Sequence, residues 1–118
     1  MKNLLITIIL CGLLACTKEQ PQMPSLEGSM YSGTNIVLES IYKARTTVEI
    51  QFITQNSCIE TEYIQGGWLA GTYTHSGIYE IKGNTVTWIT DGAEAHAEIN
   101  GSTLVQSSPM GIITYYKK

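Results

Sequence analysis

The fold of this chain is decided by residues 77–104, which read GIYEIKGNTVTWITDGAEAHAEINGSTL. Three turn signals divide this stretch: Gly83-Asn84, Asp91-Gly92 and Asn100-Gly101. Asn-Gly and Asp-Gly favour type I′ hairpin turns, because both central residues of such a turn need a positive φ. The runs between the signals are rich in β-branched and aromatic residues and alternate with period 2, which is typical of strands. The stretch therefore predicts four consecutive antiparallel strands.

The three turns agree on a single apolar face. Taken as two-residue turns, they place Trp88 opposite Tyr79 and Ala95, Val86 opposite Ile81 and Ala97, and Ala97 opposite Leu104. A one-residue slip in any turn would move side chains to the other face. The predicted inner face consists of Tyr79, Ile81, Val86, Trp88, Ala95, Ala97, Ile99 and Leu104. The predicted outer face consists of Glu80, Thr85, Thr87, Glu94, His96, Glu98 and Thr103, with Ile78, Ile89 and Val105 as apolar exceptions.

The preceding residues extend the sheet. His75-Ser76-Gly77 is predicted as a three-residue loop with Gly in the left-handed position, which would place Tyr73 opposite Tyr79 on the inner face. Residues 47–53 predict a half-buried strand, since Val48, Ile50 and Phe52 alternate with polar residues. Ile59, Thr61 and Tyr63 predict a partner strand across the Gln55-Asn56-Ser57 turn.

The remaining segments complete a barrel. Gly66-Gly67 predicts a corner or a bulge, and residues 29–42, which lack clean alternation, predict one or two strands. Residues 112–116 predict the last strand, with Ile113 and Tyr115 inward. About eight strands with one apolar face cover that face by curling onto themselves. We therefore predict an all-β chain: a single antiparallel meander of about eight strands curled into a small barrel.

The first fifteen residues have the layout of a signal peptide. A basic start, Met1-Lys2-Asn3, precedes an apolar run from Leu4 to Ala15. A helix needs about 20 apolar residues to span a bilayer, so this run is too short. An ordinary secretory peptide and a buried first strand are the alternatives. Residues 16–27, which carry Pro21 and Pro24, predict a flexible tether, and residues 28–118 form the predicted barrel domain.

Two sets of residues resemble known bacterial proteins. Leu13-Leu14-Ala15-Cys16 resembles the lipobox of bacterial lipoproteins, which implies that Cys16 becomes the lipidated first residue. Together with residues 77–88, 99–104 and 111–115, it resembles the small lipocalin-like lipoproteins of Bacteroidetes. This resemblance implies a lipocalin-like barrel in the bacterial cell envelope, whose partner is the lipid bilayer through palmitate and other acyl chains on Cys16. Thr17 favours the outer membrane, because an Asp there would resemble an inner-membrane retention signal.

Composition excludes several function classes. A length of 118 residues permits one domain. A net charge of −3, with seven Lys and Arg, lacks the basic footprint that nucleic-acid binding requires, so no nucleic-acid partner is expected. With Cys11 removed and Cys16 lipidated, Cys58 has no partner for an intramolecular disulfide. The chain has no Gly-x-Ser-x-Gly, phosphate-loop or His-Glu-x-x-His motif, so we expect neither an enzyme nor a cofactor.

One strand carries a candidate metal site. Glu94, His96 and Glu98 point to the same side of their strand, next to Glu80 and Thr87, and carboxylate with imidazole is a ligand set for zinc. Charged residues at this spacing are also typical of a solvated outer face, and His75 is the only other imidazole. We predict a solvated face and no metal site.

The predicted inner face suggests a ligand. Six inward side chains form the candidate binding site: Tyr73, Tyr79, Trp88, Ala95, Ala97 and Tyr115. The small alanines opposite Trp88 and Val86 either fill the barrel by complementing the larger side chains or leave space for a small apolar ligand. We expect a non-enzymatic barrel that binds such a ligand in or at its mouth.

The alternative function belongs to a different class. A surface-interaction or inhibitor module would bind an envelope protein or glycan through its loops or outer face. The apolar exceptions Ile78, Ile89 and Val105 would form the contact patch, and Trp68, beside the Gly66-Gly67 corner, is the candidate exposed aromatic. The sequence identifies no specific protein partner.

Replacing the lipobox cysteine tests the anchor. Cys16→Ser removes the thiol that accepts the diacylglyceryl group, so the variant should no longer incorporate radioactive palmitate and should leave the membrane fraction. Stable anchoring requires two or three chains, because each buried CH₂ contributes only about 0.8 kcal/mol. Mass spectrometry should place the mature amino terminus of the unmodified sequence at Cys16. Continued labelling of Cys16→Ser, or a different mature terminus, would contradict the prediction.

Overall fold

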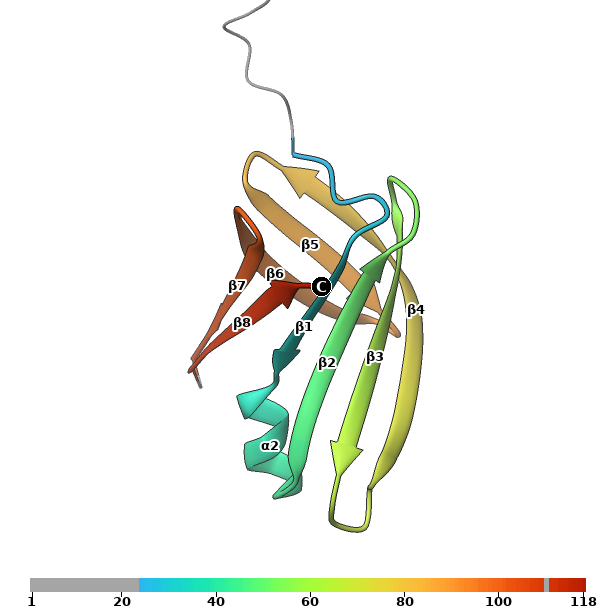
Figure 1. Cartoon of the computed structure of the whole chain (residues 1–118), viewed down its shortest axis with the longest axis vertical. Coiled ribbons are helices and arrows are strands. Elements are labelled where there is room, and N and C mark those ends of the chain that lie inside the picture. The colour runs from blue at the N-terminus through green and yellow to red at the C-terminus, as the bar shows by residue number, and fades with distance from the viewer. Residues whose placement is uncertain (1–23, 110) are drawn as a thin grey trace, which may run out of the picture.

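The computed structural model describes residues 24–109 and 111–118 of the chain. The predicted signal peptide, Cys16 and most of the predicted tether lie outside these residues. Eight strands and one short helix form a closed barrel (Figure 1). The elements are β1 (Met30–Thr34), α2 (Ile36–Tyr42), β2 (Arg45–Phe52), β3 (Ser57–Gln65), β4 (Gly71–Lys82), β5 (Thr85–Thr90), β6 (Ala93–Asn100), β7 (Thr103–Ser108) and β8 (Gly111–Lys117).

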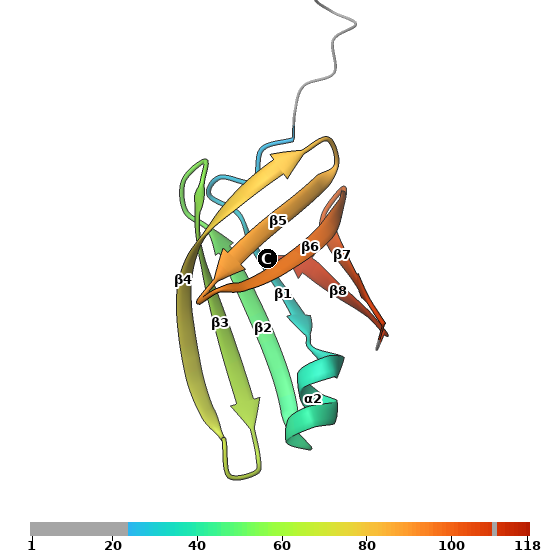
Figure 2. The same cartoon turned by 180° about the vertical axis from the view of Figure 1, so that it is seen from behind.

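The barrel has the predicted meander topology. Each strand pairs antiparallel with the next along the chain, and β8 returns to β1 through the pairs Tyr31–Lys117 and Ser32–Tyr116. The all-β prediction of about eight strands is confirmed. In Figures 1 and 2, α2 and the β3–β4 loop lie at one end of the barrel, called the lower end here. The described residues that precede β1, drawn in blue, lie at the opposite, upper end (Figure 1).

Two of the three predicted hairpins have the predicted register. Trp88 lies opposite Tyr79 in β4 and opposite Ala95 in β6, and Asp91 and Gly92 have the positive φ angles that their turn requires, 50° and 79°. The predicted pairing of Ala97 with Leu104 is wrong, because Leu104 lies opposite Ile99. The turn is Gly101-Ser102, since Asn100 still pairs with Thr103. A shift of two residues leaves every side chain on its predicted face.

The predicted loop at His75-Ser76-Gly77 does not exist. Strand β4 runs continuously through it, pairing with β3 from Gly71 to Ile78 and with β5 from Gly77 onward. Gly77 serves close packing instead of a turn: a Cβ there would lie 2.0 Å from the carbonyl oxygen of Ile89. Tyr73 therefore lies opposite Glu62 of β3, and the predicted pairing of Tyr73 with Tyr79 is wrong.

Strand β3 pairs with β2 across the predicted turn, and this pairing decides which of its residues face the core. Phe52 of β2 faces the core and pairs with Cys58 of β3. Since paired residues lie on the same face, the even-numbered residues of β3 also face inward. Ile59, Thr61 and Tyr63, the residues that predict this strand, lie on the other face, away from the core. The inward residues of β3 are Cys58, Glu60, Glu62 and Ile64.

Residues 29–42 form one strand and a helix, whereas the sequence predicts one or two strands. Asn35 caps α2, because its side chain accepts a hydrogen bond from the Leu38 N–H at 3.1 Å. Lys43 ends the helix in the left-handed conformation, with φ 56°. Val37 of α2 packs against the core. A seven-residue helix is too short to show a clear 3.6-residue period, which explains why the sequence pattern does not reveal it.

Large aromatic side chains dominate the core. Trp88 and Tyr115 are 1% and 2% exposed and make an edge-on contact with ring centroids 6.1 Å apart. Phe52 makes a similar contact with Tyr79. Leu26, which the sequence assigns to the tether, is 3% exposed and belongs to the core, so the packed domain begins before residue 28. None of the helices described is both long and apolar enough to cross a membrane.

Filling the contact at Gly77 should destabilise the barrel. Gly77→Ala places a methyl group against the backbone of Ile89, and forced overpacking of this kind costs about 1–3 kcal/mol. The free energy of unfolding, measured in urea, should fall by that amount. Ser76→Ala at the neighbouring exposed position is the control and should be nearly neutral. Equal stability of both variants would show that Gly77 does not hold β4 and β5 in close contact.

Candidate functional site

The barrel wall is incomplete at its lower end. Residues Gly71–Ser76 of β4 pair with β3, whereas β5 begins to pair with β4 only at Gly77. Pairing between β6 and β7 is likewise limited to Glu98–Asn100 and Thr103–Val105. Inward side chains near these edges reach solvent: Tyr73 is 38% exposed, and Ala95 is half-buried. The inner face is therefore partly exposed to solvent at this end.

Two carboxylates of β3 face inward at this end. The Trp88 indole N–H donates a hydrogen bond to Glu60 Oε2 at 2.9 Å. Glu62 Oε1 lies 3.9 Å from His75 Nε2, with side chains that are 17% and 28% exposed. The other ring nitrogen of His75, Nδ1, bonds to the carboxylate of Asp91 at the β5–β6 turn. A carboxylate can only accept, so this nitrogen is the donor.

The two carboxylates change the titration of their neighbours. Burial raises the pKa of Glu62, the negative charge of Glu60 raises it further, and His75 acts in the opposite direction. The pKa of Tyr115 is also raised, mainly by burial and then by Glu60 and Glu62. The Tyr115 hydroxyl donates to Gln106 Oε1 at 2.8 Å. The lower end thus combines aromatic surface with concentrated acceptor oxygens and negative charge, a setting that favours a cationic or hydrogen-bond-donating group.

The six predicted ligand residues do not all lie at the same end of the barrel. Tyr73 lies opposite Glu62 and Ala95 lies opposite Trp88, which contacts Tyr115. The Tyr79 hydroxyl bonds instead to the carbonyl oxygen of Thr54 in the β2–β3 loop, at the upper end. Ala97 is 2% exposed within the core. Four predicted residues, Tyr73, Trp88, Ala95 and Tyr115, therefore lie toward the accessible end.

Sequence reasoning missed the polar members of this site, Glu60, Glu62 and Gln106. A signal for the glutamates was present: Cys58 and Ile64, two residue types that are usually buried, share the parity of Glu60 and Glu62. Gln106 shares the parity of the inward residue Leu104. Acidic residues are usually assigned to an outer face, and that general tendency concealed the pattern.

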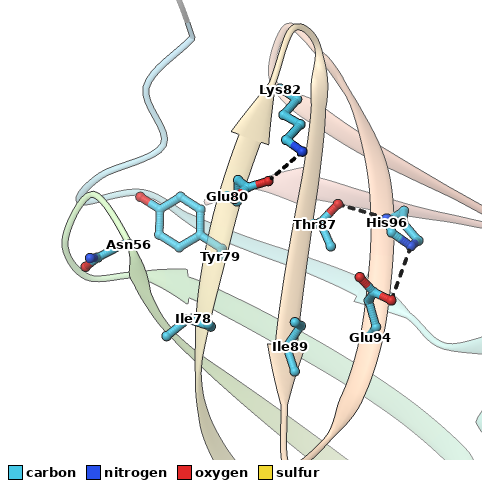
Figure 3. Close-up of a pocket in the computed structure, with 9 residues that line it drawn as sticks. All are labelled: Asn56, Ile78, Tyr79, Glu80, Lys82, Thr87, Ile89, Glu94 and His96. Atoms are coloured by element: carbon cyan, nitrogen blue, oxygen red, sulfur yellow. Dashed lines mark hydrogen bonds and ion pairs between the residues drawn. The ribbon is translucent and has the colours of Figure 1, made fainter.

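A second candidate site lies on the outer face of β4, β5 and β6. Figure 3 shows Ile78 and Ile89 side by side in a groove of about 600 Å³, and these two residues lie directly opposite each other in the β4–β5 pair. Glu80 forms an ion pair with Lys82 at 3.2 Å. Val105, the third predicted apolar exception, lies opposite Glu98 in the β6–β7 pair and does not line the groove.

The predicted outer carboxylates are solvated. Glu94, His96 and Glu98 are exposed, and His96 Nδ1 forms a hydrogen bond of 2.8 Å with Thr87 Oγ1. Within residues 24–109 and 111–118, no group of three or more His, Cys, Asp and Glu side chains is arranged to hold a metal ion. Cys58 is buried, and burial together with Glu60 raises its pKa to about 11, so its thiol is a poor nucleophile.

Comparison with protein families, curated proteins and solved structures finds no match to this chain. The resemblance to lipocalin-like lipoproteins therefore stays a prediction. The function has to be inferred from the residues and contacts described above.

Removing the charge of Glu62 should change how stability depends on pH. Because its folded-state pKa is raised, the folded chain binds more protons than the unfolded chain between the two pKa values, and stability decreases as pH rises through that window. Glu62→Gln removes this loss. Relative to the original sequence, the variant should gain stability between about pH 4 and pH 7, as measured by urea unfolding.

The exposed Glu98 of β6 provides the control, and Glu98→Gln should show no such gain. The inference that the Glu62 charge is buried would be contradicted if the stability difference between Glu62→Gln and the original sequence were the same at the lower and the higher pH, or if it decreased as the pH rises.

Proposed function

We propose that the protein is a lipid-anchored, non-enzymatic, lipocalin-like barrel that binds a small, mainly apolar ligand bearing a cationic amine. The observation that carries the proposal is the inward placement of Glu60 and Glu62 beside Tyr73 and Trp88. Among the described residues, neither carboxylate forms an ion pair with a Lys or Arg. Inward negative charge without such a partner favours a ligand that supplies the cation.

The proposed site supports both parts of such a ligand. Tyr73 and Ala95 provide accessible apolar surface, and Glu62 provides the acceptor for a charge-assisted hydrogen bond. A purely apolar molecule would remove water from the Glu62 carboxylate without replacing its hydrogen bonds, which is unfavourable. The ligand class is therefore narrower than the apolar molecule that the sequence suggests.

Anchoring and the absence of catalysis remain parts of the proposal. The lipobox resemblance at Cys16 supports the anchor. The described residues that precede β1 lie at the upper end (Figure 1), where Pro24 lines a pocket with Gln55 of the β2–β3 loop, so the accessible lower end lies away from them. The burial and raised pKa of Cys58 support a non-enzymatic role, since the thiolate is the reactive form.

Titration with three amphiphiles of equal chain length tests the ligand class. Residues 17–118 include every described residue, and Trp68→Phe in this chain leaves Trp88 as the only fluorophore of its kind. Below their critical micelle concentrations, dodecylamine should change Trp88 emission at a concentration about tenfold lower than dodecanol, and dodecanoate should bind more weakly than either; a tenfold change corresponds to about 1.4 kcal/mol. Glu62→Gln should abolish the preference for the amine.

Glu98→Gln, on the outer face, is the matched control and should retain the preference. The proposal fails if dodecanoate binds as tightly as dodecylamine, or if no amphiphile changes the emission of Trp88.

A second candidate function is a surface module that holds an envelope protein or glycan in the groove of Ile78 and Ile89. The groove itself favours this candidate, because both isoleucines are exposed, 61% and 39%, and polar side chains such as Glu80 and Glu94 line the groove with them. The amphiphile titration separates the two functions. A module that acts only through the outer groove predicts no specific response of the buried Trp88.

A further inference from the structure

The lower end of the barrel carries a separate apolar surface on its outside. Trp68 in the β3–β4 loop is 89% exposed, and Ile41 near the end of α2 is 59% exposed. We call residues 41–45 and 66–70 together the tip. Exposed large hydrophobic side chains that gather in one place indicate an interaction site, whereas single ones are ordinary.

The two segments of the tip lie against each other. A Cβ at Gly67 would lie 3.7 Å from the Ala44 side chain and 3.8 Å from the Tyr42 carbonyl oxygen. Gly66 and Gly67 both have positive φ, which lets the loop turn tightly and present Trp68 beyond the strands. The Tyr73 hydroxyl donates to the Leu69 carbonyl oxygen at 2.8 Å and so holds the loop to β4. Figures 1 and 2 both show this loop and α2 at the same end.

The tip also carries the positive charge of this end. Lys43 and Arg45 are exposed, and neither forms an ion pair with any described residue, unlike Lys82 and Lys118. Neither segment of the tip contains an acidic residue, and the carboxylate of Glu39, earlier in α2, accepts a hydrogen bond from the Thr46 N–H at 3.3 Å. In a chain of net charge −3, two unpaired cations beside exposed apolar side chains define the chemistry of the partner.

We propose that the tip docks onto the surface of a lipid bilayer that contains anionic headgroups. Trp68 and Ile41 enter the interfacial region, where Trp is favoured because its ring is apolar and its N–H is polar. Lys43 and Arg45 contact the headgroups, each contributing about 1 kcal/mol near an anionic surface. The inference goes beyond the proposed ligand site, since it uses neither the inward carboxylates nor Cys16.

Binding of the lipid-free chain to vesicles tests the inference. Residues 17–118 retain all eight strands and the core, so this chain lacks only the predicted signal peptide and Cys16. It should sediment with vesicles that contain 70% phosphatidylcholine and 30% phosphatidylglycerol, and only weakly with pure phosphatidylcholine. The emission of Trp68 should shift to shorter wavelength and be quenched by brominated phosphatidylcholine in those vesicles.

Two variants separate the contributions of the tip. Trp68→Ser should weaken partitioning about fivefold or more, and Lys43→Gln with Arg45→Gln should weaken it about tenfold on anionic vesicles and leave weak binding to pure phosphatidylcholine unchanged. Ile53→Ser, at an exposed site in the β2–β3 loop at the upper end, and Lys82→Gln with Lys117→Gln are the matched controls. These controls should retain most of the binding.

Three outcomes would overturn the inference: no sedimentation with anionic vesicles, sedimentation that the tip variants leave unchanged, or Trp68 emission that vesicles do not shift. A concentration-dependent dimer that Trp68→Ser abolishes, without vesicle binding, would assign the tip to a second copy of the chain instead. All substituted residues are exposed, so circular dichroism should confirm that every variant is folded.

Discussion

Closure of the sheet is the constraint on which the rest of the structure depends. Once β8 pairs with β1, the barrel has one interior, and each strand must place alternate residues inside it. Trp88 occupies the centre of that interior: it lies opposite Tyr79 and Ala95, packs edge-on against Tyr115 and donates to Glu60. One buried indole therefore connects the apolar core to the polar lower end.

The same constraint explains why carboxylates lie inside a small barrel. The parity of β3 follows from the pairing of Phe52 with Cys58, so Glu60 and Glu62 cannot face outward without exposing Cys58 and Ile64. The cost of their burial is limited, since Glu60 accepts the Trp88 N–H and Glu62 lies where the wall is incomplete. The raised pKa of Glu62 is the remaining sign of that cost.

The lower end brings together the two inferred activities. Its inner side carries Glu62, Tyr73 and Ala95, the residues of the proposed ligand site, and its outer side carries Trp68 with Lys43 and Arg45. The described residues that precede β1 lie at the other end of the barrel, where Pro24 lines a pocket with Gln55 of the β2–β3 loop (Figure 1). The two experiments remain independent, because the substituted side chains belong to different faces.

The sequence by itself determined the local features. Two tight turns were specified by Gly83, Asp91 and Gly92, because these residues tolerate a positive φ. The period-2 alternation of apolar residues specified the inner face of β5 and β6. Only the tertiary structure decided the role of Gly77, the helix at Ile36–Tyr42 and the inward face of β3. Each of these depends on a neighbour distant in sequence: the Ile89 backbone, the core beneath Val37, and the parity that β2 imposes. A turn is determined by the φ angles of its own residues. A close backbone approach or a buried charge depends instead on the neighbouring strand, and closure of the barrel determines which strand that is.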